Sequence, residues 1–118
     1  MRYKLRNMGA GNRFRFTAIF HLFEIVNTRQ GPKKMALLDN VRCGHKKKAK
    51  HLWLNVGKRL DNYDLRQGDK IQFTAIIQVY SKVNHWNKGA RIMDYTLDYF
   101  EDFTILRRVK RKKKKNDD

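Results

Sequence analysis

One cysteine and one proline in 118 residues are the first limits on what this chain can be. Cys43 has no partner for a disulfide within the chain, which excludes a small scaffold held together by disulfides. The N-terminus lacks a charged segment followed by an apolar run and a small-residue cleavage site. Together these absences predict a cytoplasmic protein.

Apolar runs long enough to cross a bilayer are also missing, and no basic amphipathic helix with a 3.6-residue period is visible. A membrane surface is therefore not the expected partner. Acidic residues are few, because 11 Asp and Glu stand against 28 Lys and Arg, a formal net charge of +17. That charge would repel itself in a compact fold unless a polyanion neutralised it, and nucleic acid is the polyanion we expect.

Signatures of catalysis are absent as well. The chain has no glycine-rich phosphate loop, no HExxH sequence and no nucleophile elbow, so we expect no enzyme and no cofactor. Asp94 and Asp98 could be considered as Mg²⁺ ligands of a nuclease, but four residues along a strand separate them by about 13 Å, too far for one ion. We interpret these acids, with Glu101 and Asp102, as surface groups that favour solubility or pair with the basic tail.

A metal site is not expected either. Cys43, His45 and His51 have no fourth ligand at a familiar spacing, and the lysines between them would repel a cation. We interpret Cys43 as an ordinary thiol beside a solvated basic loop.

The basic residues that are present gather in the N-terminal arm "MRYKLRNMGAGNR", in "RCGHKKKAK" at residues 42–50, and in "RRVKRKKKKNDD" from Arg107 onward. The last segment has too few apolar residues to order itself by burial, so residues 107–118 are predicted to be a disordered tail. Without that tail, residues 1–106 still hold 20 Lys and Arg against 9 Asp and Glu. With 41% apolar residues, this part is expected to form one basic globular domain.

Strand-like alternation dominates that domain, and no long helix is visible. Strands are expected over residues 13–26, 34–43, 51–56 and 70–80. A fifth strand is expected from residue 94 onward, with a break at Glu101 and Asp102. A short helical turn is expected near residues 60–65, before the turn at Gly68 and Asp69. The first strand, residues 13–26, alternates so that one face holds Phe14, Phe16, Ala18, Phe20 and Leu22.

Five strands, with most of the irregular structure between the third and the fourth, predict an all-β domain folded as a small closed barrel. The succession of "FTAIFHLFEIV", "MALLDNVRC", "HLWLNV", "LRQGDKIQFTAIIQVY" and "YTLDYFEDFTIL" resembles the oligonucleotide-binding barrel, the OB-fold, over residues 13–106. The segments "HLWLNV" and "GDKIQFTAIIQVY" carry most of the resemblance. The chain is most similar to the small single-stranded nucleic-acid-binding OB proteins of bacteria, phages and mobile elements.

The resemblance implies a binding face on the second and third strands, with the loops after the first and the fourth strand closing on the ligand. Here those loops are "NTRQGPK" and "SKVNHWNKGARI". Trp86 in the second loop would stack on a base, an interaction worth about 1–3 kcal/mol that tolerates any base. Alternatively, Trp86 folds back as a hydrophobic lid over the open end of the barrel.

Trp53 alternates with Leu52 and Leu54, which predicts that it stands on the outer face of the third strand and can stack there. The alternative is that Trp53 packs under an N-terminal extension or helix. Tyr80 is expected at the edge of the binding face, and Phe23 is expected to return to the core through a bulge in the first strand.

The predicted site therefore has no catalytic residue and no metal ligand, and its stacking residues are Trp53, Trp86 and Tyr80. Stacking and backbone contacts do not read base edges, so we expect largely sequence-independent binding of single strands, with DNA favoured over RNA. The predicted phosphate-binding residues are Arg42, Lys46, Lys47, Lys48, Lys50, Lys82, Lys88 and Arg91.

Two other functions remain open on the sequence. A ribosomal or ribonucleoprotein component would use the same barrel and its basic arms to bind folded RNA. A phage-type inhibitor would instead dock by charge on a protein machine that handles nucleic acid. A protein partner would accordingly belong to a replication, recombination or ribosomal complex.

Overall fold

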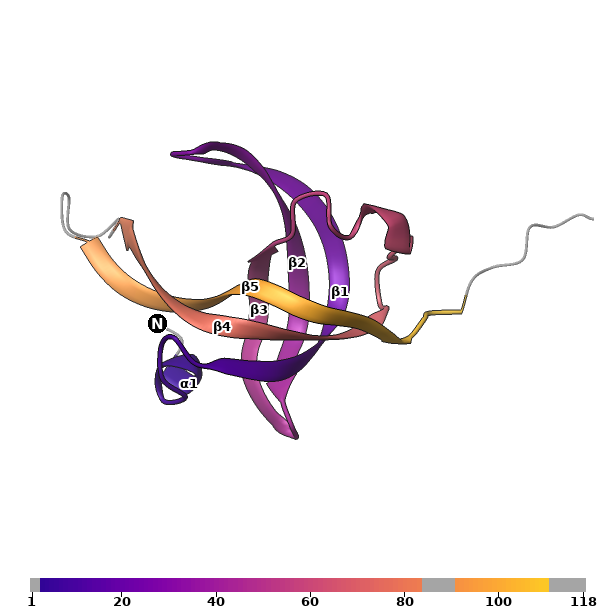
Figure 1. Ribbon diagram of the computed structural model, residues 1–118, viewed down its shortest axis with the longest axis horizontal. Coiled ribbons are helices and arrows are strands. Elements are labelled where there is room, and N and C mark those ends of the chain that lie inside the picture. The colour runs from indigo at the N-terminus through magenta and orange to yellow at the C-terminus, as the bar shows by residue number, and fades with distance from the viewer. Residues whose placement is uncertain (1–2, 84–90, 111–118) are drawn as a thin grey trace, which may run out of the picture.

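The computed structural model describes residues 3–83 and 91–110. Its strands form one antiparallel sheet in the order β3-β2-β1-β4-β5 (Figure 1), which confirms the predicted all-β class and the five strands. The strands are β1 (Arg13–Thr28), β2 (Gly31–Cys43), β3 (Lys46–Asn55), β4 (Lys70–Val83) and β5 (Arg91–Arg107), and the helical elements are α1 (Tyr3–Arg6) and the 3₁₀ turn η1 (Asp61–Tyr63).

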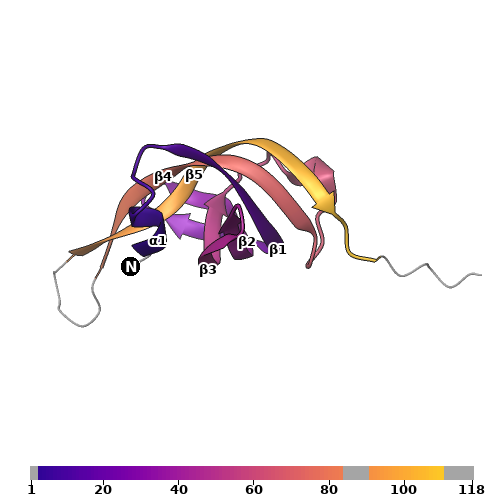
Figure 2. The ribbon, with the colours of Figure 1, turned by 90° about the horizontal axis from the view of Figure 1, so that it is seen from below.

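The sheet curls on itself but does not close. β3 and β5 approach each other, yet in the described part of the chain no ladder of hydrogen bonds joins them. α1 packs against both strands, and its Leu5 is fully buried, so the helix lies where the two edges converge. The expectation of a closed barrel is therefore wrong at this edge, although the curvature is that of a small barrel-like fold (Figure 2).

β-Bulges supply the curvature. Ile76 pairs with Asp98 and Thr74 with Glu101, so β5 has one extra residue between these two pairs. Tyr99, which follows Asp98, has a positive φ of 52°, and Asp102 further along has 53° at the next register shift. Each bulge bends the strand and increases its twist. The predicted break at Glu101 and Asp102 is not found, because β5 is continuous there and accommodates the change of phase by bulges.

The apolar faces of all five strands meet in one core. Phe16 and Phe73 are directly paired across β1 and β4, both are fully buried, and their ring centroids lie 6.0 Å apart. The buried apolar residues of the strands are Phe16, Ala18, Phe20, Ala36, Leu38, Val41, Ala49, Leu52, Leu54, Ile71, Phe73, Ala75, Ile77, Leu97 and Phe100.

A register shift in β1 changes which residues face this core. Phe20 pairs with Leu38 and Leu22 with Leu37, so His21 is the extra residue on β1. The alternation changes phase at this point, and Leu22, predicted to face the core, is instead 36% exposed. Phe23 takes the inward place and packs against Phe20 at 4.7 Å between ring centroids, as predicted for a bulged strand.

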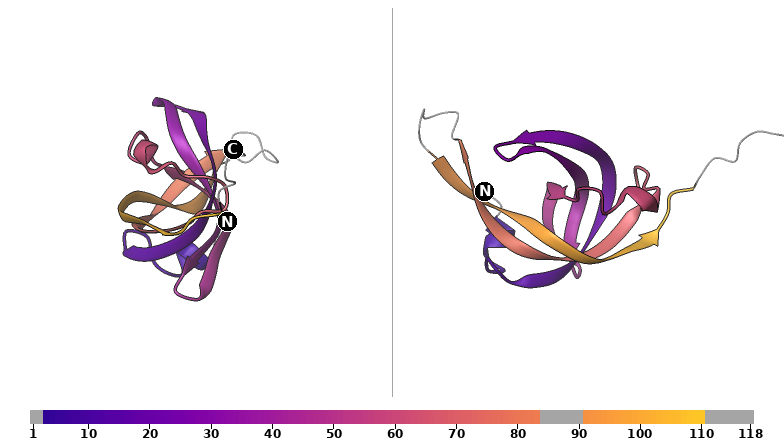
Figure 3. Two further views of the ribbon diagram at one scale, coloured as in Figure 1. Left: turned by 90° about the vertical axis from the view of Figure 1, so that its right-hand side faces the viewer. Right: turned by 45° about the horizontal axis from the view of Figure 1, so that its top comes forward.

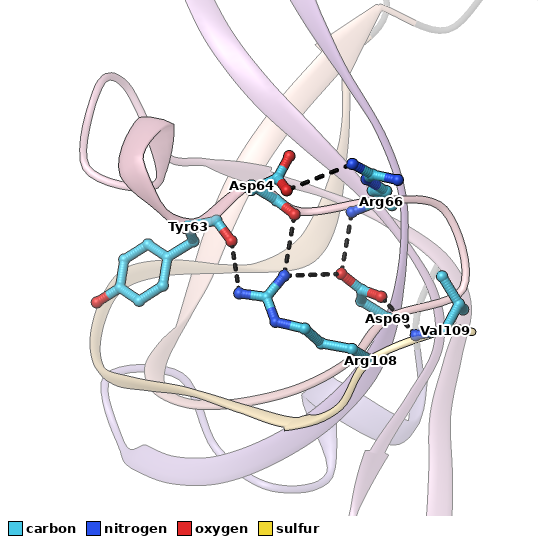
Figure 4. Close-up of polar contacts among 6 residues, drawn as sticks. All are labelled: Tyr63, Asp64, Arg66, Asp69, Arg108 and Val109. Carbon is cyan, nitrogen blue, oxygen red and sulfur yellow. Dashed lines mark hydrogen bonds and ion pairs between the residues drawn. The ribbon is translucent and has the colours of Figure 1, made fainter. Parts of the chain in front are cut away.

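The C-terminal end of the fold is held by a buried carboxylate (Figure 4). Asp69 is fully buried and accepts hydrogen bonds from the backbone amides of Arg66 at 3.0 Å and Val109 at 2.8 Å. Arg108 lies 3.7 Å from the same carboxylate and donates to the carbonyl oxygens of Tyr63 and Asp64. β5 ends at Arg107, and the next two residues are tied to the loop before β4 by these contacts.

Replacing Asp69 tests how much this attachment contributes to stability. In Asp69→Asn, one of the two backbone amides faces an amide nitrogen instead of an acceptor, and an unsatisfied buried donor costs about 1–3 kcal/mol. We expect the free energy of unfolding, measured by urea denaturation with tryptophan fluorescence, to fall by about 2 kcal/mol.

Asp64→Asn is the matched control for this measurement. It removes an equal charge from the same loop, but the Asp64 side chain is 72% exposed and its ion pair with Arg66 is on the surface. Such pairs contribute about 0–1 kcal/mol. Equal losses for the two variants would contradict the role assigned to Asp69.

Candidate nucleic-acid interface

The position of Trp53 follows from the alternation of β3. Leu52 and Leu54 are buried on either side of it, so the indole projects from the opposite face of the strand. Trp53 pairs with Leu37, which pairs with Leu22, and this row crosses β3, β2 and β1 on the outer face. The predicted placement of Trp53 opposite the aliphatic face is confirmed.

Trp53 lines a hollow of about 300 Å³ to which every strand of the sheet contributes. The β1–β2 hairpin curves over one side of the molecule while the β4–β5 hairpin extends along another (Figure 3). Tyr80, predicted from sequence as an edge residue of the binding face, lines the same hollow as Trp53. The full lining is Val26, Met35, Trp53, Asn55, Tyr80, Thr96, Leu97 and Asp98.

A second hollow of about 360 Å³ adjoins the first, because Asn55 and Asp98 line both. Its other lining residues include two cations, Lys33 and Arg59, and one aromatic ring. The ring belongs to Tyr99, which is 59% exposed. We call the two hollows together the groove. The second hollow is lined by Lys33, Asn55, Val56, Gly57, Arg59, Asp98 and Tyr99.

Both cations of the groove are held in place by neighbouring groups. The guanidinium carbon of Arg59 lies 3.8 Å from the centroid of the Phe100 ring, a cation–π contact that fixes it beside β5. The Lys33 Nζ donates to Gln30 Oε1 at 2.6 Å across the turn of the β1–β2 hairpin. Positive charge therefore stands at the groove in defined positions.

The basic residues predicted to bind phosphate lie mostly elsewhere. Lys46, Lys47, Lys48 and Lys50 belong to β3 itself rather than to a loop, since the strand begins at Lys46. Lys46, Lys47 and Lys50 are exposed and Lys48 is half-buried. By strand rise, Lys47 is about 20 Å from Trp53 along β3. These lysines form a charged hairpin end, separate from the aromatic groove.

Arg42, also predicted to bind phosphate, closes the turn of this hairpin. Its Nε donates to Asn40 Oδ1 at 3.1 Å and its Nη1 donates to the carbonyl oxygen of His45 at 3.0 Å. Two of the five guanidinium donors of Arg42 are therefore used within the protein.

The remaining predicted site residues are Lys82 at the end of β4, Arg91 at the start of β5, and Trp86 and Lys88 in the sequence between them. Trp86 and Lys88 lie outside the described residues. Lys82 and Arg91 are placed by their backbones alone, Lys82 opposite Ile92 and Arg91 opposite Val83 at the ends of the two strands.

A polar cluster that the sequence did not reveal lies on the outer face next to the Trp53 row. The Nδ1 of His51 is 2.7 Å from one carboxylate oxygen of Asp39, and the Nδ1 of His21 is 3.1 Å from the other. The three residues come from three neighbouring strands, so only the pairing of β1, β2 and β3 brings them together.

Sequence reasoning also missed most of the groove. Asn55 follows Trp53 at the alternate position, a signal that could have been used. The sequence gave no such signal for Arg59 or Tyr99. The position of Arg59 depends on the loop after β3, and that of Tyr99 depends on a bulge in β5.

The interpretation of the β5 acids as surface groups needs correction. Asp94 is 3% exposed and accepts a hydrogen bond from the Tyr95 amide, and Asp98 lines the groove. Glu101 does remain at the surface, where it pairs with Arg13 at 3.5 Å.

Within residues 3–83 and 91–110, no helix has the length and apolar character needed to cross a membrane. The same residues contain no group of three or more His, Cys, Asp or Glu side chains placed to hold a metal ion. In comparisons with known proteins, the chain matches no protein-family model and no curated protein.

Proposed function

We propose that this protein binds single-stranded nucleic acid in the groove, by base stacking and phosphate contacts and without catalysis. The observation that carries the proposal is that Trp53 and Tyr80, from β3 and β4, line one hollow. Stacking on aromatic side chains in a basic groove is how single strands are bound with little regard to sequence. A base in a duplex is already stacked and paired, so only an unpaired base can enter such a hollow.

The strand arrangement supports an OB-type interpretation of the fold. β1 pairs with both β2 and β4, β5 flanks β4, and β3 approaches β5 at the open edge. OB-folds are five-stranded, partly open barrels whose binding face lies on the second and third strands between two hairpin loops. On this interpretation the groove would correspond to that binding face, since Trp53 and Asn55 line it from the outer face of β3 and residues of the β1–β2 and β4–β5 hairpins complete its lining.

The charged hairpin end then extends the binding path. Bases bound at the groove leave phosphates near Lys33 and Arg59, and a longer strand that follows β3 reaches the lysines some 20 Å away. The groove would provide the stacking and the hairpin end would provide additional electrostatic attraction for longer strands. We take single-stranded DNA as the first ligand and RNA of equal length as the comparison.

Trp53→Leu removes the stacking surface while retaining apolar volume. Loss of one stack, worth about 1–3 kcal/mol, should weaken the binding of a short oligo(dT) by roughly 5-fold to 160-fold. Fluorescence anisotropy of the labelled oligonucleotide measures this loss, and Tyr80→Leu should show a smaller effect of the same sign.

Tyr3→Leu is the control for loss of an aromatic ring. Tyr3 is 62% exposed on α1 and does not line either hollow. Its affinity should equal that of the unaltered protein. A Trp53→Leu protein that binds within twofold of the unaltered protein would rule out stacking at this position.

Lys47→Gln/Lys50→Gln tests the binding path along β3. Each phosphate neutralised on a single strand contributes about 0.7 to the slope of log affinity against log salt, so this variant should lower the slope by about 1.4 for a long oligo(dT). An oligonucleotide short enough to fill only the groove should show no change. Salt titrations at both lengths measure the difference.

Arg66→Gln/Lys70→Gln removes the same charge near the start of β4, away from the proposed path. Its slope should match that of the unaltered protein at both lengths. If both double variants lowered the slope equally, binding would reflect total charge, and the proposed path along β3 would be wrong.

A further inference from the structure

Asp98 is an acidic side chain in the middle of the groove of a strongly basic protein. It lines both hollows together with Asn55, and it stands in the same hollow as Trp53 and Tyr80. Its Oδ1 accepts a hydrogen bond from the Tyr99 amide at 2.8 Å, which fixes the orientation of the carboxylate. Within the described part of the chain, no ion pair engages Asp98, although the chain holds 28 Lys and Arg.

A carboxylate in this place repels phosphate, so its favourable partner on a nucleic acid is a base. An ionised carboxylate only accepts hydrogen bonds, and it accepts most strongly when two adjacent donors meet its two oxygens. A base stacked on Trp53 or Tyr80 would turn its edge toward the wall of the hollow that Asp98 and Asn55 share. Asp98 would therefore favour a base that presents hydrogen-bond donors on that edge.

Guanine is the base whose edge fits. Its N1–H and N2–H₂ groups are adjacent donors that match a carboxylate, and its O6 can accept from the amide nitrogen of Asn55. Adenine and cytosine place one amino donor beside an acceptor nitrogen. Thymine and uracil place N3–H between two carbonyl oxygens. These oxygens would lie close to the carboxylate oxygens and be repelled by them.

We propose that the groove contains a guanine-selective position in which Asp98 reads the N1–H and N2–H₂ edge. The inference rests on the proposed function, because it assumes that a base enters the groove. It departs from the sequence-independent binding that composition predicts. One guanine in the right place should tighten binding by roughly 10-fold over thymine, the range expected for a bidentate base contact.

The test uses labelled nine-nucleotide oligo(dT) molecules in which the central base is guanine, adenine, cytosine, hypoxanthine or thymine. A single guanine in a thymine strand avoids association between strands. Anisotropy titrations at one salt concentration should rank guanine first, with hypoxanthine, which lacks the 2-amino group, between guanine and thymine. Asp98→Asn should reduce the guanine preference to below twofold. Its binding to the all-thymine strand should become tighter, because the charge that repels phosphate is gone.

Asp102→Asn is the matched control, since Asp102 is an exposed acid of β5 that lines neither hollow and also has a positive φ, which asparagine tolerates. It should keep the full guanine preference. Tight binding of the all-thymine strand with no guanine preference would overturn the inference and leave the proposed function standing. A guanine preference that persists in Asp98→Asn would also overturn it, whereas failure of every strand to bind would refute the proposed function itself.

Discussion

The apolar face of this molecule can be covered only by the sheet that carries it. There is one five-stranded sheet, and the described helical elements are a four-residue helix and a three-residue turn, too small to form a second layer. The sheet must therefore bend until its own strands enclose the core. The bulges in β1 and β5 provide that bend, and the buried phenylalanines across β1 and β4 occupy the enclosed space.

The proposed site is a consequence of the same bending. Strands longer than the core requires continue past it as hairpins, and two of these hairpins flank the outer face of β3 where the sheet remains open. Val79, although it continues the inward alternation of β4, is 37% exposed because it already belongs to such an extension. The groove thus lies between hairpins that are anchored in the core at one end. This anchoring holds the aromatic, basic and acidic side chains of the groove in defined positions.

Local patterning was sufficient to predict the five strands and most of the core, but not the short helix α1. Alternation located all five strands, the inward faces of β3 and β4, and that of β1 as far as Phe20, including the buried Phe16, Leu52 and Phe73, because strand periodicity is a property of neighbouring residues. Even the bulge that returns Phe23 to the core could be anticipated from the broken alternation around it.

What could not be predicted depends on pairing between distant segments. The contact of Asp69 with Val109 joins residues 40 positions apart, and the meeting of Asp98 with Asn55 and Trp53 depends on how β5 curves back toward β3. The extra residues of β5 are decided by register, which no single segment encodes. For this reason the sequence alone predicts surface positions for the acids of β5 and a closed barrel, whereas the structure buries Asp94 and leaves the sheet open between β3 and β5.

The central claim is that bases enter the groove on the outer face of β3, and chemical-shift mapping tests it most directly. A ¹⁵N-labelled sample titrated with an oligo(dT) long enough to reach residues 46–50 should show its largest changes at the Trp53 indole N–H and at the amides of Asn55, Thr96 and Asp98, with smaller ones along the basic part of β3. Changes confined to residues 46–50, with the Trp53 indole unmoved at saturation, would contradict the account and leave only a charged surface without a site for bases.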